Sequence, residues 1–90
     1  MGDDAPVTLE RMRNLGPVTA SRLRAVGIET PDELRKLGAI DAYVRLKLAF
    51  QTEITPSHLY ALHGAVTDVR WYALPEEARA ALRDAAARRL

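Results

Sequence analysis

Three prolines stand where helices are expected to begin, and they divide the chain into short helical segments. Pro17, Pro31 and Pro56 each precede residues with helical spacing. Proline is favoured at the first helical position, because its missing N–H would have no partner there and its fixed φ suits the helix. A threonine before Pro31 and before Pro56 can cap the helix, and Glu33 completes a capping box with Thr30. The chain is therefore expected to consist of short helices joined by tight turns.

Apolar residues at helical spacing fill the segments, and glycines close two of them. Gly27 and Gly38 follow apolar stripes, where a helix C-terminus tolerates the left-handed conformation. No segment alternates polar and apolar residues as a strand would. We therefore expect an all-α fold of five or six helices, in one domain of residues 8–90 after a lead-in of residues 1–7. The expected helices span 8–14, 17–26, 31–37, 39–50, 56–68 and 75–89.

The centres of the apolar stripes predict the core. The expected core residues are Leu23, Leu34, Val44, Leu62 and Leu82. The helix expected over 39–50 has a wide apolar face, which predicts contacts on more than one side; this face comprises Ile40, Tyr43, Val44, Leu48 and Phe50. Gly64 falls inside a helix, where glycine costs about 1 kcal/mol relative to alanine, so we expect another helix to approach it closely.

The residue inventory excludes several classes of chemistry. The chain has no cysteine, so it forms no disulfide, thiolate nucleophile or cysteine-ligated metal site. His58 and His63 lie about 140° apart around a helix and cannot share a metal unaided. The sequence contains no Gly-x-x-x-x-Gly-Lys loop of the kind that binds phosphate, and no Ser, His and Asp in a pattern typical of a catalytic triad. We predict a non-enzymatic protein with no cofactor, metal or small-molecule substrate.

Neither a secretory leader nor a membrane span is expected. The first residues are acidic and lack an apolar stretch, and no apolar run approaches the roughly 18 residues that a span needs. These features predict a cytoplasmic protein with no membrane partner.

Charge is balanced over the whole chain but not locally. Thirteen basic and 12 acidic residues give a net charge of +1, which neither requires nor excludes a polyanionic partner. Arg11, Arg13, Arg22 and Arg24 occur with no acidic residue between Arg11 and Ile28. Because Arg22 and Arg24 lie about 200° apart on a helix, an ordinary solvated face is an alternative to a phosphate-binding one.

Two short segments share a pattern around a glycine. Residues 15–20 and 37–42 both read Leu-Gly-x-(Val/Ile)-(Thr/Asp)-Ala. A duplicated helical hairpin and a chance similarity both remain open.

The first of these segments resembles the helix-hairpin-helix motif. The matching positions are Leu15, Gly16, Ala20 and Leu23. The resemblance implies that backbone N–H groups of the hairpin face a phosphate. Asn14 replaces the first hairpin glycine and tolerates positive φ better than most residues, whereas Val18 stands where DNA-binding members often carry lysine. Gly16 is either a purely structural turn residue or one that also contacts an anion. If its φ is positive, Gly16→Val is expected to cost about 1–3 kcal/mol.

A longer series of motifs resembles the C-terminal domain of the TfoX (Sxy) family. The matching segments are 14–17, 25–30, 32–39, 42–47 and 59–67, ahead of Trp71. Members of that family are bacterial regulators of natural competence, in which an N-terminal α/β domain joins a helical C-terminal one. The resemblance implies a bacterial regulatory protein, and we expect the chain to be a stand-alone copy of the C-terminal domain.

Two functions follow from these features. The first is weak, sequence-independent DNA binding through the hairpin at 15–18, with a site formed by Arg11, Arg13, Leu15, Gly16, Val18 and Arg22. The second is docking of an unidentified regulatory protein or a second copy on aromatic residues, namely Tyr43, Tyr60, Trp71 and Tyr72. For Trp71 and Tyr72, covering the core at the junction of the last two helices is an alternative to docking. The hairpin resemblance and the local arginines favour DNA. The small net charge and Val18 favour protein interaction, which is our preferred hypothesis.

Overall fold

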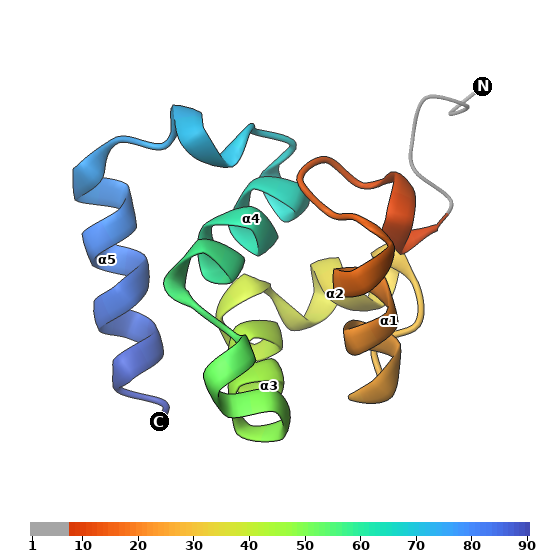
Figure 1. Cartoon of the computed structure of the whole chain (residues 1–90). Coiled ribbons are helices and arrows are strands. Elements are labelled where there is room, and N and C mark those ends of the chain that lie inside the picture. Colours follow the sequence, from red (N-terminus) through yellow and green to blue (C-terminus); the bar gives the residue numbers. More distant parts are fainter. Residues whose placement is uncertain (1–7) are drawn as a thin grey trace.

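A computed structural model describes residues 8–90, and it confirms the all-α fold (Figure 1). The described residues form five α-helices and three short 3-10 helices. The α-helices are α1 (Pro17–Ala25), α2 (Pro31–Leu37), α3 (Ala39–Phe50), α4 (Pro56–Thr67) and α5 (Glu76–Ala87). The 3-10 helices are η1 (Leu9–Arg11), η2 (Gln51–Glu53) and η3 (Trp71–Ala73). The predicted lead-in, residues 1–7, lies outside the described residues.

The helix starts lie where the prolines predict them. Pro17, Pro31 and Pro56 are the first residues of α1, α2 and α4. The capping box of α2 is complete, since the Glu33 N–H donates to Thr30 Oγ1 at 3.1 Å and the Thr30 N–H donates to Glu33 Oε1 at 3.1 Å. These starts agree with the sequence because capping depends on residues only three apart.

The prediction of a helix over residues 8–14 is wrong. Residues 8–14 form only one 3-10 turn, after which Met12 is extended and Asn14 has a left-handed φ of 73°. Thr8 makes no side-chain cap. A segment this short gains few helical hydrogen bonds against the cost of nucleation. The single turn nevertheless buries Leu9 and Met12 in the core.

Helix α3 is the centre of the molecule and packs against α1, α2, α4 and α5. In Figure 1, α5 lies on one side of α3 and α4, and α1 and α2 lie on the other. The expectation that this helix makes contacts on more than one side is therefore correct. No helix in residues 8–90 combines the length and apolar character needed to cross a membrane.

Four of the five predicted core residues are buried: Leu23, Leu34, Leu62 and Leu82. The fifth, Val44, is only half-buried, and Leu48 is 66% exposed. The buried stripe of α3 consists of Ala39, Ala42, Tyr43 and Leu46. These residues are three or four positions apart, or adjacent at 42 and 43, and so lie on one helical face; Val44 and Leu48 lie outside this stripe.

The two Leu-Gly segments share a helix start but differ before it. Gly16 and Gly38 directly precede α1 and α3. Gly38, at φ 92°, joins α2 directly to α3, whereas Gly16 is extended at φ −122° and follows an irregular turn. Only the second segment therefore has a helix on both sides of its glycine. The left-handed residue of the first turn is Asn14, so the premise of positive φ at Gly16 does not hold.

Candidate functional site

The side chain of Asn14 joins the turn before α1 to the opposite end of the chain. Its Nδ2 donates to the Val69 carbonyl oxygen at 2.8 Å and to that of Ala61 at 3.4 Å. Its Oδ1 accepts the Trp71 N–H at 3.2 Å. These bonds hold the connection between α4 and α5 against the turn.

Gly64 allows this connection to pass close to α4. The Val69 N–H donates to the Gly64 carbonyl oxygen at 2.8 Å, and Asp68 ends α4 in a left-handed conformation. A Cβ at position 64 would collide with the Val69 carbonyl oxygen and the Asn14 side chain. The predicted close approach is present, but it comes from the connection and Asn14 and not from another helix.

Trp71 and Tyr72, which we call the aromatic pair, are exposed on η3. Trp71 is 36% exposed and Tyr72 61%. Their rings meet edge to face, with centroids 6.2 Å apart. Two further backbone bonds close the turn beneath them, from the Ala73 N–H to Arg70 O at 2.9 Å and from the Leu74 N–H to Trp71 O at 3.2 Å. The two rings are thus displayed on a backbone that is fixed on both sides.

Two arginines contact the aromatic pair. Arg70 Nη1 donates to the Tyr72 hydroxyl at 3.2 Å. The Arg79 guanidinium lies between two rings, 5.6 Å from the Trp71 centroid and 5.5 Å from that of Tyr60, within cation–π range. Its Nη2 donates to the Tyr72 carbonyl oxygen over a long 3.4 Å. Its Nε is buried with no acceptor among the described residues.

A neighbouring ion pair anchors Tyr60. Arg83 donates to the Tyr60 hydroxyl at 2.6 Å and to Glu76 Oε2 at 2.8 Å. The hydrogen bond from Arg83 lowers the pKa of Glu76, and the bonds to Glu76 and Tyr60 raise the pKa of Arg83. Glu76 is therefore already engaged by Arg83.

The arginines around the predicted hairpin are mostly paired with carboxylates. Arg13 pairs with Asp68 at 2.9 Å and Arg22 with Glu53 at 3.4 Å. The Arg24 guanidinium binds both carboxylate oxygens of Glu10, at 2.6 and 2.7 Å, and these bonds lower the pKa of Glu10 to about 2. Such bidentate pairs are among the strongest polar contacts.

The remaining hairpin residues are divided between surface and core. Arg11 is exposed and forms no salt bridge with residues 8–90. Val18 is exposed, Gly16 is half-buried and Leu15 is buried. The structure therefore does not gather the predicted DNA-binding residues into one free cationic surface.

Residues 5–86 match the protein family described as the TfoX C-terminal domain. The chain belongs to this family. A crystal structure of an uncharacterized protein from Listeria monocytogenes, in a triclinic form, is 36% identical, with a TM-score of 0.79 over 84% of this chain and 85% of that one. A tetragonal form from the same organism, titled a protein of unknown function, gives the same identity and TM-score over 84% and 93%. No curated protein matches the chain.

In this TfoX C-terminal domain, the four aromatic residues predicted for docking do not share one surface. Tyr43 and Tyr60 are only 6% and 7% exposed, because α3 and α4 direct them into the core. Burial raises the pKa of Tyr43. Helical spacing could have predicted the burial of Tyr43, since Tyr43 lies on the same buried stripe of α3 as Ala42 and Leu46. Sequence reasoning missed Arg70, although it directly precedes Trp71, and Arg79, which reaches the aromatic pair from α5 through the fold.

One open pocket is lined both by Asn14 of the hairpin turn and by Trp71 of the aromatic pair. Its volume is about 210 Å³, and it is lined by Asn14, Thr19, Ser57, His58, Ala61 and Trp71. Burial lowers the pKa of His58, and the charge of Arg22 acts in the same direction. The Thr55 N–H donates to His58 Nδ1 at 3.1 Å, so this imidazole helps to start α4.

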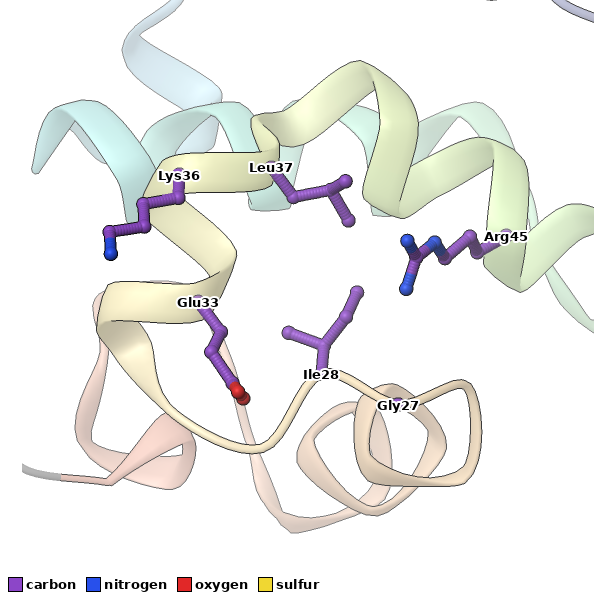
Figure 2. A pocket seen from close by; sticks show the side chains of 6 residues that line it. All are labelled: Gly27, Ile28, Glu33, Lys36, Leu37 and Arg45. Carbon is purple, nitrogen blue, oxygen red and sulfur yellow. The ribbon is translucent and has the colours of Figure 1, made fainter.

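The larger pocket in Figure 2, of about 370 Å³, lies where the end of α1 meets α2 and α3. Ile28 and Leu37 form its apolar floor, and Arg45 reaches in from α3. The Glu33 carboxylate accepts the Glu29 and Thr30 N–H groups at 2.7 and 3.1 Å, so it serves the start of α2. No group of three or more acidic or histidine side chains in the described part of the chain could hold a metal ion.

Proposed function

We propose that this TfoX C-terminal domain is a non-enzymatic protein-interaction module, which binds its partner through the aromatic pair, Arg70 and Arg79. The observation that carries the proposal is the exposure of Trp71 and Tyr72 next to two arginines that contact them. Tryptophan, tyrosine and arginine are the residue types most enriched among the energetically dominant residues of protein interfaces.

The rigidity of this surface supports the proposal. Asn14 binds the backbone on both sides of Arg70, and Arg79 stacks on the Trp71 ring. A surface that is ordered before binding loses little conformational entropy when the partner docks. More of the free energy gained by burying the two aromatic rings against a partner therefore appears as binding affinity.

The family supports a regulatory context. Proteins of the TfoX family are regulators of bacterial competence, and we propose that this domain serves competence or transcription regulation by binding another regulatory protein in the cytoplasm. The experiment is affinity capture from bacterial lysate, with the domain and two variants as baits.

Tyr72→Ala removes half of the aromatic pair, and Leu48→Ala is its matched control, because Leu48 is 66% exposed on α3 and Tyr72 is 61% exposed. We expect a protein retained by the unaltered domain and by Leu48→Ala to be lost with Tyr72→Ala. Equal retention on all three baits would contradict the proposal. Circular dichroism of each bait checks that the helices are intact.

A second candidate is weak DNA binding by the turn before α1. It is favoured by the left-handed Asn14 in the turn, as the helix-hairpin-helix motif requires of its first glycine, and by Arg11, which binds no carboxylate of residues 8–90. The pairing of Arg13, Arg22 and Arg24 weighs against it. The dependence of its DNA affinity on salt concentration tests this candidate.

A further inference from the structure

Arg70 and Arg79 differ from the other cations of the described chain in contacting the aromatic pair without forming a salt bridge. Salt bridges within residues 8–90 engage Arg13, Arg22, Arg24, Arg35, Arg83 and Arg89. Neither Arg70 nor Arg79 is among these, although both contact the aromatic pair. The exposed rings are thus flanked by two positive charges that form no salt bridge with a carboxylate of residues 8–90. The hydrogen bond of Glu76 goes to Arg83 and lowers the pKa of this carboxyl, and the charge of Arg79 is near enough to lower it further.

Arg79 in particular has unused hydrogen-bonding capacity. A guanidinium carries five N–H donors, and the contacts of Arg79 are one long bond from Nη2 and two aromatic faces. Arg79 is half-buried, and its buried Nε has no acceptor among the described residues, which is unfavourable for a polar group. An acceptor brought by a partner would relieve this cost, and charge-assisted bonds of this kind are about twice as strong as neutral ones.

We propose that the partner segment bound by this surface is an acidic peptide, with carboxylates for Arg70 and Arg79 and adjacent apolar side chains for Trp71 and Tyr72. This inference rests on the proposed function, and it names the chemistry of the partner. Hydrophobic contact with the rings supplies affinity, and the two ion pairs set the register of the peptide.

The neighbouring acidic residues favour a peptide over a nucleic acid. Asp68 precedes the aromatic pair and Glu76 follows it, and their side chains are 81% and 72% exposed. Each is paired with an arginine, so among the described residues only Arg70 and Arg79 offer unpaired charge beside the rings, which is little for a backbone that carries a phosphate at every nucleotide. A peptide can place its carboxylates at the two arginines and avoid these sites.

The test is selection of a randomised peptide library on the immobilised domain, followed by titration of the selected peptides. Trp71 is the only tryptophan of the chain, so its fluorescence reports binding at this surface directly. We expect the selected peptides to carry aspartate or glutamate next to an aliphatic or aromatic residue. Replacing these acids by asparagine or glutamine should weaken binding about tenfold or more, the effect of losing one charge-assisted hydrogen bond.

The variants Arg70→Gln and Arg79→Lys should weaken binding of the same peptides, the second because lysine keeps the charge but loses the planar fork. Arg88→Gln is the control, since Arg88 is exposed at the end of α5 and takes part in no salt bridge with the described residues. It should leave the affinity unchanged.

The other outcomes separate this inference from the proposed function. Selected peptides that need Tyr72 but show no enrichment of acids would overturn the inference and leave the proposed function standing. If no selected peptide depends on Tyr72, both fail. Binding of an oligothymidylate that quenches Trp71, or concentration-dependent dimerisation that Tyr72→Ala abolishes, would replace the acidic peptide by a nucleic acid or by a second copy.

Discussion

Asn14 combines two requirements that few residues meet together. Its φ of 73° lies in the left-handed region, where asparagine is several-fold enriched over other non-glycine residues. Its amide also binds both sides of the connection between α4 and α5. Glycine would satisfy the backbone alone, and aspartate could adopt this φ but has no N–H to donate to the Val69 carbonyl oxygen.

Two substitutions separate these roles. Asn14→Gly should destabilise the domain by about 1–3 kcal/mol, because it removes the hydrogen bonds to the backbone of Ala61, Val69 and Trp71. Asn14→Ala should cost about 1–2 kcal/mol more, the penalty of left-handed backbone at a residue with a Cβ. Urea unfolding followed by circular dichroism measures both. Equal stability of the two variants would show that the backbone at position 14 is not strained.

Gly64 is closely packed on the side where a Cβ would lie, whereas the same side of Gly16 is open. Gly64→Ala gains about 1 kcal/mol of helix propensity but places its Cβ against the Val69 carbonyl oxygen. Because a backbone atom cannot swing away as the end of a side chain can, overpacking should dominate, with a net loss of about 1–3 kcal/mol. Gly16→Ala meets open space at an extended φ, and should cost at most about 1 kcal/mol, the loss of a favourable N-cap. Thermal unfolding of the pair distinguishes them, and the reverse order would contradict the packing described around Gly64.

At the scale of elements, α3 decides the core. It packs against four other helices, and its buried stripe runs through Tyr43 and Leu46. The sequence pattern alone predicted Val44 as a core residue, because Leu48 and Phe50 extend the apolar face of this helix around it. The neighbours of α3 select which part of that face is covered.

The comparison of Leu46→Ala with Val44→Ala tests this choice. Leu46 is fully buried, so its truncation should cost about 2–5 kcal/mol. Val44 is half-buried, so the loss of two methyl groups there should cost less than about 1 kcal/mol. Chemical denaturation of both variants decides the matter; a larger loss for Val44→Ala would mean that α3 is rotated about its axis.

At the scale of the whole molecule, the near-neutral charge is organised as ion pairs between elements. The pairs of Arg13, Arg22 and Arg24 join η1, α1, η2 and the end of α4, where a DNA-binding surface would need free cations. Apart from the bidentate Arg24–Glu10 pair, exposed ion pairs of this kind contribute little to stability. Their larger effect is to reduce the positive field around the turn before α1.

The salt dependence of DNA binding measures this reduction. Each neutralised phosphate contributes a slope of about −0.9 to log affinity against log salt concentration. Arg11 alone would give about −0.9 and all four arginines about −3.6. We expect weak or absent binding with a slope no steeper than about −2, lost in Arg11→Glu and kept in Arg88→Gln. Fluorescence anisotropy of a labelled duplex at several salt concentrations provides the slope, and a value near −3.6 would show that the ion pairs open on DNA.

The local signals in the sequence determined where helices begin and the fold class. Capping boxes and first-position prolines act within one helical turn, so Thr30, Pro31 and Pro56 specify their helix starts without help from the rest of the chain. The sequence places Trp71 and Tyr72 between two helices, where they could either cover the core or be exposed, and the structure shows that both are exposed.

Contacts between residues far apart in sequence were decided by the tertiary structure. Asn14 meets Val69 and Trp71 across 55 and 57 positions, and Arg83 meets Tyr60 across 23. Tyr60 is buried and Arg79 reaches Trp71 because α5 folds back over α4. Helical periodicity gives the direction of a side chain relative to its own axis, but the neighbour that meets it depends on how the helices pack.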